Sequence, residues 1–470
     1  MMWRKPWEDS WVAIPTDAVT YIVYKEGDYY IAKDGMSGKV VSENTSLAPV
    51  LQALAELVDA GKGAVISFER DNYVLDSKVA FPAGVYLVGN GATLDVTGLN
   101  DFAFTFNENS NGVIEEDKLT GLWGFKVISS TLQLGSAIAY FENISRGVVV
   151  RDVVYFNIDM AVEITGASYS ALVSNLKGWY SNRAVKLTRF VVNSTSYAPD
   201  MTYLSHIELT GKAGLVNTGP AIYVDTEVNN VNTNYLYAEG LQLGFEDHGN
   251  YTSVVSSKFQ STNKAMSLSG FATIVHGNAI RLILDSAIGI SIDKDEFYGE
   301  ITNNFFFGYY VDSVKAILSR TNSFDGMIDG NVFHSVGLTG ESEFFDGYAR
   351  YATINNNRIW VLGSNLTGYA INITNDGWDS IVGNLVYTNG NAIHARGYSV
   401  IEGNTVFADG TPYYLSGPIY CDQYLYTSLP DTSDANVSKI FLNRPIHYYD
   451  GTNYYIAVWD GTTWRKTQLT

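Results

Sequence analysis

The chain has 470 residues, of which 17% are charged, and it is rich in glycine (43) and tyrosine (33). This composition is too apolar for a disordered chain and is typical of many short strands joined by tight turns. Acidic residues outnumber Lys and Arg by 49 to 30, and the net charge of −19 argues against nucleic acid as a partner, because phosphate contacts need a basic face.

Cysteine and histidine usage limits the kinds of site that the chain can build. The single cysteine, Cys421, excludes an intrachain disulfide and a cysteine-rich zinc site, and the six histidines lack metal-ligand spacing. No apolar run reaches the roughly 18 residues of a membrane-spanning helix, so we expect no insertion into a membrane. Residues 1–7 carry charge without an apolar segment behind them, and we find no secretory signal peptide.

The first segments predict a hairpin and then one helix. Residues 21–24 and 29–32 are apolar and flank Lys25–Asp28, which favours a β-hairpin. The helix is predicted over Leu47–Ala60, with Ser46 as its N-cap and Gly61 at its end. Its apolar residues form one stripe: Leu51, Leu54, Leu57 and Val58.

Two short motifs recur along the rest of the chain. One is Ile-x-x-Asn, whose asparagines are spaced by 27, 26, 27 and 20 residues: Asn304, Asn331, Asn357, Asn384 and Asn404. The other is Ala-Φ-x-Φ, where Φ is apolar, and it begins at Ala161, Ala184, Ala221, Ala265 and Ala370. A period in the twenties that carries strands and no helix predicts a β-solenoid, whose stacked coils form the core together. Because an amide both donates and accepts, we expect the asparagines to stack in one column.

These segments resemble the pectate-lyase-like right-handed β-helix superfamily over about residues 46–410. Leu47–Ala60 is similar to its N-terminal capping helix, and Phe68–Leu75 and Val85–Gly91 are similar to its first coils. The resemblance implies an all-β fold, a right-handed parallel β-helix with an N-terminal capping helix and small β units at both ends. The superfamily includes polysaccharide lyases, hydrolases, epimerases, viral tailspikes and adhesins, so the fold alone does not decide the activity.

The C-terminal segment breaks the period. Tyr448–Tyr455 and Val458–Trp464 are centred on Asp-Gly pairs, which favour hairpins, and a solenoid end needs a cap over its core and strand edges. The segment is also similar to small aromatic modules of viral tail fibres. We therefore divide the chain into a small β unit (residues 1–45), a β-helix with its capping helix (46–420) and a C-terminal β cap with hairpins (421–470).

The middle coils predict a polar groove on the outside of the solenoid. In an Ala-Φ-x-Φ strand the apolar positions point inward, so the residue between them points outward. Aligning four strands on this pattern gives one outward row, Glu163, Lys186, Tyr223 and Gln242, and a second row two residues later, Thr165, Thr188, Asp225 and Gly244. An insertion over residues 189–200 adjoins these rows, and solenoids place insertions beside binding faces. The local basic cluster would suit a carboxylated sugar: Arg183, Lys186 and Arg189.

Acidic residues near these strands offer alternative chemistries. Asp225 and Glu246 are expected roughly 8 Å apart on neighbouring coils, which fits inverting glycoside hydrolysis. A lyase would instead use Tyr223 or Lys186 as base and Arg189 as cation. The same carboxylates could bind Ca²⁺, or the rows could be a solvated face. We assign as candidate catalytic residues Lys186, Tyr223, Asp225 and Glu246, and as candidate substrate-binding residues Glu163, Arg189, Gln242, Asp247 and His248.

Two functional hypotheses follow. The chain is either a polysaccharide lyase or glycoside hydrolase acting on an acidic glycan, or a non-catalytic glycan-binding protein for receptor recognition or adhesion. The insertion and the mixed outward row favour an enzyme, whereas the lack of the catalytic motifs of the superfamily favours a binder. In both cases we expect a polysaccharide partner, an extracellular, cell-surface or virion location, no cofactor other than an optional Ca²⁺, and a monomer or homotrimer.

Overall fold

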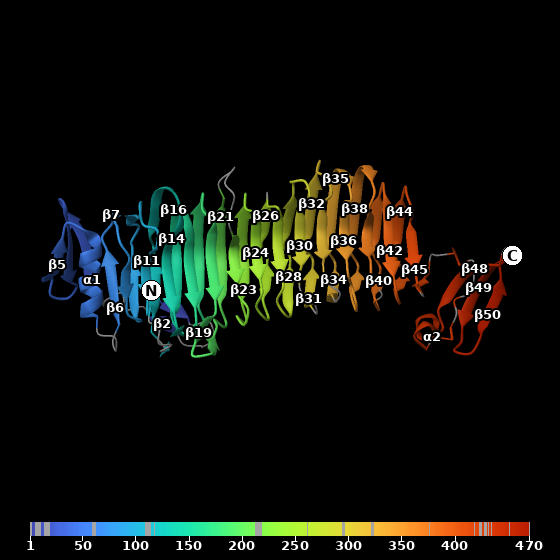
Figure 1. The fold of residues 1–470 in the computed structure, drawn as a ribbon, viewed down its shortest axis with the longest axis horizontal. Helices are drawn as coiled ribbons and strands as arrows, with labels where there is room; N and C mark the ends of the chain where they lie inside the picture. Colours follow the sequence, from blue (N-terminus) through green and yellow to red (C-terminus); the bar gives the residue numbers. More distant parts are fainter. Residues whose placement is uncertain are drawn as a thin grey trace. The chain divides into compact units, whose positions relative to one another are not determined.

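The computed structural model describes residues 2–4, 11–13, 19–58, 63–108, 114–116, 118–211, 219–260, 262–293, 297–320, 324–375, 377–417, 419–422, 425–426, 430, 432–433, 435–450 and 452–469. The chain divides into two compact units, residues 1–253 and 254–470. Each unit consists mainly of short parallel strands stacked coil on coil, as a right-handed parallel β-helix (Figure 1). The predicted all-β fold class is confirmed.

Unit 1 begins with an antiparallel sheet of β3 (Tyr21–Glu26), β4 (Tyr29–Asp34) and β5 (Val40–Asn44). Glu26 pairs with Tyr29, so Gly27 and Asp28 form a two-residue turn, and the predicted hairpin is confirmed. Gly27 has φ +60°, a conformation that glycine adopts without strain.

The predicted helix, α1 (Leu47–Leu57), begins where the sequence indicates but ends before Ala60, because Val58 is already extended. Gly61, the expected end of the helix, lies outside the described residues. Ser46 is at the N-cap position, but its side chain makes no capping hydrogen bond. Its Oγ instead lies 3.3 Å from an oxygen of Asp76. Leu51 and Leu54 of the predicted stripe are fully buried, together with Leu47 and Val50, whereas Leu57 is 52% exposed and does not belong to the buried face.

The coils of unit 1 place successive Ala-Φ-x-Φ strands side by side. The strands of this column are β14 (Lys126–Glu142), β16 (Val148–Thr165), β18 (Arg183–Thr188), β22 (Pro220–Val224) and β24 (Leu243–Asp247). Val162 pairs with Val185, and Val185 pairs with Ile222, all three being buried. A second column contains β17 (Leu172–Trp179), β21 (Tyr203–Thr210) and β23 (Asn232–Glu239). The inward direction of the Φ positions is therefore as predicted.

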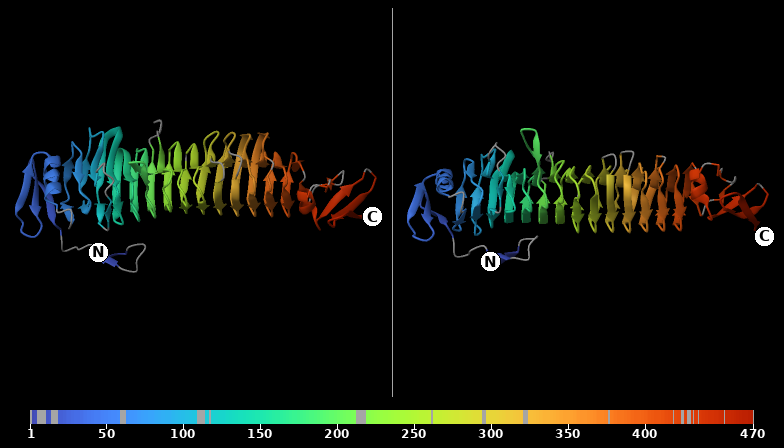
Figure 2. Two further views of the ribbon diagram at one scale, coloured as in Figure 1. Left: turned by 60° about the horizontal axis from the view of Figure 1, so that its bottom comes forward. Right: turned by 90° about the horizontal axis from the view of Figure 1, so that it is seen from below.

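The predicted insertion forms a hairpin of its own. β19 (Phe190–Val192) pairs antiparallel with β20 (Thr195–Tyr197) through a turn at Asn193 and Ser194, both with positive φ. The hairpin projects from the coils as a separate green finger in the right-hand view of Figure 2. It starts one residue after Arg189, at the end of β18.

Unit 2 repeats three strands per coil. The Ala-Φ-x-Φ column consists of β27 (Lys264–Leu268), β30 (Ile288–Ile292), β33 (Lys315–Ser319), β36 (Glu343–Gly347), β39 (Tyr369–Ile373), β42 (Asn391–Arg396) and β45 (Tyr413–Ser416). The Ile-x-x-Asn column consists of β28 (Thr273–His276), β31 (Phe297–Thr302), β34 (Phe324–Asp329), β37 (Thr353–Asn355), β40 (Ser380–Val382), β43 (Val400–Glu402) and β46 (Tyr420–Cys421). The third column consists of β26 (Lys258–Gln260), β29 (Ala279–Leu282), β32 (Phe305–Tyr309), β35 (Val332–Gly340), β38 (Arg358–Leu366), β41 (Leu385–Thr388) and β44 (Thr405–Ala408).

The repeated asparagines stack in one buried column, as the sequence predicts. Each side-chain nitrogen donates to the Oδ1 of the next asparagine, at 3.0 Å from Asn304 to Asn331 and 3.0 Å from Asn331 to Asn357. The same Oδ1 also accepts the backbone N–H of the preceding asparagine. The column starts one coil earlier than predicted, at Asn278, which donates to Asn304 at 2.9 Å. Its motif begins with Val275 instead of isoleucine, so the pattern search missed it.

The third column carries an outward row of aromatic side chains that the repeat search did not identify. In-register pairing aligns one residue from each of five successive strands: Phe307, His334, Trp360, Tyr387 and Phe407. Three neighbouring pairs in this row have rings near each other, with centroids 6.3 Å apart for Phe307 and His334, 5.8 Å for His334 and Trp360, and 5.9 Å for Tyr387 and Phe407. Such cross-strand pairs add to the stability of the stacked coils.

The C-terminal segment is an antiparallel sheet with a short helix. β48 (Pro445–Tyr449) pairs with β49 (Tyr454–Trp459), which pairs with β50 (Trp464–Gln468), so both predicted hairpins are confirmed. α2 (Ala435–Phe441) was not predicted, and its buried Phe441 packs with Ile446 and Trp459. The three-part division made from the sequence stays a prediction.

Candidate functional site

A pocket of about 480 Å³ opens on the outward face of the Ala-Φ-x-Φ column in unit 1. Three neighbouring strands, β18, β22 and β24, contribute most of its wall. Its lining combines charged, hydroxyl and apolar groups: Arg183, Lys186, Thr188, Gly219, Pro220, Tyr223, Asp225, Gln242, Leu243 and Glu246. All four candidate catalytic residues are therefore brought together in one pocket.

The strand register decides which side chains are neighbours. Glu163 pairs with Lys186, and Lys186 pairs with Tyr223, as predicted. Tyr223 then pairs with Glu246 rather than Gln242, so the predicted alignment of the fourth strand was wrong by four residues. Gln242 precedes β24 and reaches the pocket from its rim. In this register Gly244 lies opposite the inward-pointing Ala221 on the neighbouring strand, so Gly244 does not belong to the second outward row.

Lys186 is held by Glu163 on the preceding coil. Its ammonium lies 2.8 Å from Glu163 Oε1, which also accepts a hydrogen bond from Thr188 at 3.0 Å. The side chains are 28% and 13% exposed for Lys186 and Glu163, so this ion pair is largely shielded from solvent. The positive charge of Lys186 in the pocket lining is therefore balanced by Glu163, and the main role of Glu163 is to pair with Lys186.

Tyr223 lines the pocket near two carboxylates, Asp225 and Glu246. Burial, followed by the charges of Asp225 and Glu246, raises the pKa of Tyr223 above its ordinary value near 10. Its hydroxyl therefore remains protonated at neutral pH and serves as a hydrogen-bond donor. Asp225 also accepts the backbone N–H of Thr226 at 2.8 Å.

Glu246 is paired with His248 two residues further along the chain. His248 Nε2 lies 2.9 Å from Glu246 Oε1, and this hydrogen bond is the main reason that the pKa of His248 is raised above 6.5. The His248 ring also lies against Tyr223, with centroids 5.7 Å apart. His248 thus contacts two pocket residues without lining the pocket itself.

Asp247, which the sequence suggested as a substrate-binding residue, is fully buried and is not part of the pocket lining. It occupies an inward position, and its Oδ1 accepts hydrogen bonds from Thr252 Oγ1 at 2.9 Å and from the Gly249 N–H at 3.0 Å. A carboxylate satisfied in this way stabilises the turn after β24.

Arg189 links the inserted hairpin to the coil below. Its backbone N–H lies 3.4 Å from Asp225 Oδ2, and its guanidinium lies 3.4 Å from Glu227 Oε1. Glu227 also accepts a hydrogen bond from Ser196 on β20. Arg189 is thus paired at the hairpin base, outside the pocket lining, and does not stand as a cation beside Tyr223.

Arg183 is a second cation of the pocket lining, which the sequence analysis named in its basic cluster but did not choose as a candidate site residue. Its guanidinium lies directly against the backbone of Gly219, in the space that a Cβ at position 219 would occupy. Two features of the sequence could have indicated this residue. One is the basic cluster that Arg183 forms with Lys186 and Arg189, and the other is Gly219, which lacks a side chain and leaves room for the guanidinium.

The two pocket carboxylates occupy diagonal positions on neighbouring coils. Glu246 is beside Tyr223 and Asp225 is two residues beyond it, which corresponds to roughly 8 Å between the two strand positions, from the strand spacing and the rise per residue. Among the described residues, no group of three or more His, Cys, Asp or Glu side chains converges as a metal site. Ca²⁺ binding stays a prediction. Within the same described residues, no helix is long and apolar enough to cross a membrane.

The fold places the chain among right-handed parallel β-helix proteins, in agreement with the resemblance found in the sequence. No protein-family model matches the chain, and no curated protein sequence does. In fold it is similar to a single-residue mutant of the tailspike protein of E. coli bacteriophage HK620 in complex with pentasaccharide. The TM-score is 0.51 at 12% identity, over 90% of this chain and 82% of that chain.

Two other solved structures are more distantly similar. ORF18 of Geobacillus virus E2 has a TM-score of 0.40 at 10% identity, over 94% of this chain and 83% of that chain. PfbA, a surface adhesin of Streptococcus pneumoniae, has a TM-score of 0.39 at 9% identity, over 90% of this chain and 94% of that chain.

Proposed function

We propose that the chain is a surface glycan-recognition protein, on a virion or a cell, and that its unit 1 pocket binds a polysaccharide containing carboxylated sugars. The observation that carries the proposal is the pocket itself, a polar hollow of about 480 Å³ built across three coils. The complex of the HK620 tailspike with pentasaccharide, on a similar fold, supports the class of ligand.

The lining offers complementary partners for such a sugar. Arg183 supplies a planar guanidinium, the group best suited to a carboxylate, and Lys186 adds a second cation that is held by Glu163. Sugar hydroxyls can donate to Asp225 and Glu246 and accept from Tyr223. This arrangement recognises both the charge and the hydroxyl pattern of a ligand.

Binding without elimination chemistry is favoured over a lyase activity. A lyase needs a base for the proton beside the uronate carboxyl group. Tyr223 is a poor base because its pKa is raised, and the Lys186 ammonium donates to Glu163. Neither residue that the sequence suggested as the base, Tyr223 or Lys186, is thus held in a free basic form.

The proposal is tested by calorimetric titration with a panel of uronate-containing and neutral oligosaccharides. Arg183→Ala should weaken binding of the uronate ligands by about 10- to 100-fold, the value of a charge-assisted hydrogen bond. Lys177→Ala is the matched control, because Lys177 is 44% exposed and pairs with Glu208 on the other strand column of unit 1. Equal affinity of wild type and Arg183→Ala for every uronate ligand would contradict the proposal.

A second candidate function is inverting glycoside hydrolysis by Asp225 and Glu246. The diagonal carboxylates favour it, because inversion needs a separation of roughly 6.5–9.5 Å that admits a water molecule. Wild type would then release reducing ends from a bound polysaccharide, and Asp225→Asn and Glu246→Gln would each lower turnover by roughly 10²-fold or more. A bound ligand that wild type leaves uncleaved would exclude this activity for that ligand.

A further inference from the structure

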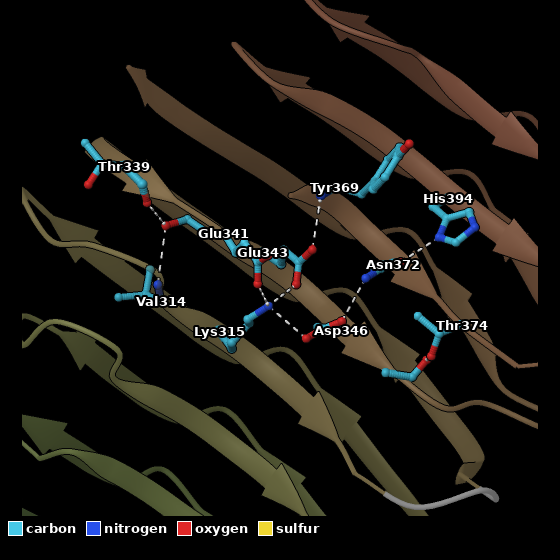
Figure 3. Close-up of polar contacts among 12 residues, drawn as sticks. Val314, Lys315, Thr339, Glu341, Glu343, Asp346, Tyr369, Asn372, Thr374 and His394 are labelled. Carbon is cyan, nitrogen blue, oxygen red and sulfur yellow. Dashed lines mark hydrogen bonds and ion pairs between the residues drawn. The ribbon is translucent and has the colours of Figure 1, made fainter. Parts of the chain in front are cut away.

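A chain of hydrogen bonds crosses four strands on the outward face of unit 2 (Figure 3). Lys315 Nζ donates to Asp346 Oδ2 at 2.8 Å, and Asn372 Nδ2 donates to Asp346 Oδ1 at 2.9 Å. Asn372 Oδ1 lies 2.7 Å from His394 Nδ1. Asp346 pairs with Asn372, and Asn372 with His394, so these side chains stack one coil apart.

The direction of this chain determines the tautomer of His394. A carboxylate can only accept, so the amide nitrogen of Asn372 must face Asp346 and the amide oxygen must face His394. An amide oxygen can only accept as well, so His394 Nδ1 carries the hydrogen. In the neutral ring Nε2 then holds a lone pair and is a hydrogen-bond acceptor. The anchor at the far end is Lys315, which also binds the buried Glu343.

The surroundings of His394 keep the ring neutral and partly open. Burial, followed by the charge of Arg396 on the same strand, lowers the pKa of His394 below 6.5. The rings of Tyr369 and Tyr414 lie 5.2 Å and 5.1 Å from the imidazole, on the two flanking strands. Tyr414 is 53% exposed. Among the described residues, none donates a hydrogen bond to His394 Nε2.

We propose that His394, Tyr369 and Tyr414 form a second glycan site, which binds a neutral sugar residue and uses no residue of the unit 1 pocket. A sugar hydroxyl donates to Nε2, and the apolar face of the sugar ring packs on the exposed tyrosine ring. A carboxylated sugar is disfavoured, because the unprotonated Nε2 cannot donate a hydrogen bond to a carboxylate. The ligand class rests on the proposed function, so the preferred polymer contains both acidic and neutral residues.

The tautomer is tested first, without ligand. Long-range ¹H–¹⁵N spectra of the ¹⁵N-histidine-labelled full chain should contain one signal set with a protonated Nδ1 and an unprotonated Nε2 that is missing in His394→Phe. Asn372→Leu should shift this signal set, because it removes the acceptor of the Nδ1 hydrogen. If the signal set that is missing in His394→Phe shows a protonated Nε2 in wild type, the proposal is overturned.

Ligand binding is tested with neutral oligosaccharides of glucose, galactose, mannose and rhamnose and with oligogalacturonate. At neutral pH, His394→Phe and Tyr414→Ala should each weaken binding of the neutral probe that wild type prefers by about tenfold or more. Tyr351→Ala is the matched control for Tyr414→Ala, because Tyr351 is also 53% exposed but lies between β36 and β37. Acidification should weaken neutral-probe binding to wild type more than to His394→Phe. Glu343, whose pKa is raised to about 7 by burial and which accepts the backbone N–H of Tyr369, is present in both proteins, so the difference between them reports on His394.

The two proposals fail in different ways. If no neutral probe binds wild type, or if His394→Phe and Tyr414→Ala bind it like Tyr351→Ala, the second site is refuted and the hydrogen-bond chain is only structural. If oligogalacturonate binds Arg183→Ala as it binds wild type, the acidic site in the unit 1 pocket is refuted. Arg183→Ala should leave neutral-probe affinity at His394 unchanged.

Discussion

Replacement of Asn331 by alanine should destabilise unit 2 strongly, because Asn331 is a fully buried member of the asparagine column. Its Nδ2 donates to the Ile301 carbonyl at 2.7 Å and to Asn357 Oδ1 at 3.0 Å. Its Oδ1 accepts from the backbone N–H and Nδ2 of Asn304 at 2.9 and 3.0 Å. Four hydrogen bonds at about 0.5–1.5 kcal/mol each give a loss of about 2–6 kcal/mol.

The loss should also be local, because neighbouring coils carry the coupling in a solenoid. Asn331→Ala leaves the N–H of Asn304 and the carbonyl of Ile301 without their side-chain partner. Hydrogen exchange should therefore accelerate most at the N–H of Asn304 and in β31 and β34. Denaturant unfolding followed by circular dichroism measures the global part of the effect, and exchange measured by mass spectrometry locates it.

Asn389→Ala is the control, because Asn389 is exposed and its side chain donates to the exposed Asp409 at 2.7 Å. We expect that variant to lie within about 0.5 kcal/mol of wild type. If Asn331→Ala also lies within that range, or if exchange in the coils around Asn304 is unchanged, the column is not a main source of stability.

Three further predictions concern unit 1. Gly219→Ala should displace the Arg183 guanidinium and weaken uronate binding by about tenfold. The melting temperature should stay the same, because only a flexible side chain has to move. Unchanged affinity would mean that Arg183 does not contact the ligand. Asp247→Ala should cost about 1–3 kcal/mol in urea unfolding, because a buried acceptor is lost. Glu246→Ala should cost at most about 1 kcal/mol, because it removes only the partly exposed pair with His248, and equal losses would contradict their different burial. The His248–Glu246 pair should stabilise the fold fully below about pH 6.5 and lose this effect as the pH rises through the raised pKa of His248. The melting-temperature difference from His248→Gln should therefore shrink as the pH is raised above 6.5.

The sequence determined the coil architecture and the asparagine column because both follow from local, periodic chemistry. Ile-x-x-Asn places an inward apolar residue and a turn amide at the same point of every coil, and the Ile residues pair in register from Ile301 to Ile401. Alternation along the strand likewise assigned Glu163, Lys186 and Tyr223 to one outward row. Such features need no knowledge of distant contacts.

Only the tertiary structure decided the register of β24. Two segments, Gly240–Leu243 and Gly244–Asp247, could match the Ala-Φ-x-Φ motif, and the apolar fourth residue of the first made it the better match. The chain uses the second, because Thr252 and Gly249 satisfy the buried carboxylate of Asp247 and remove the usual penalty for that position. This shift brings Glu246 beside Tyr223.

The hydrogen-bond chain that ends at His394 also depended on tertiary structure. Its members lie 22–31 residues apart along the sequence, in coils whose loops differ in length. No local pattern marks Asp346, Asn372 and His394 as partners, since the direction of each bond depends on which side chains the register brings face to face. The protonated nitrogen of His394 is therefore a property of the stacked coils and not of any one of them.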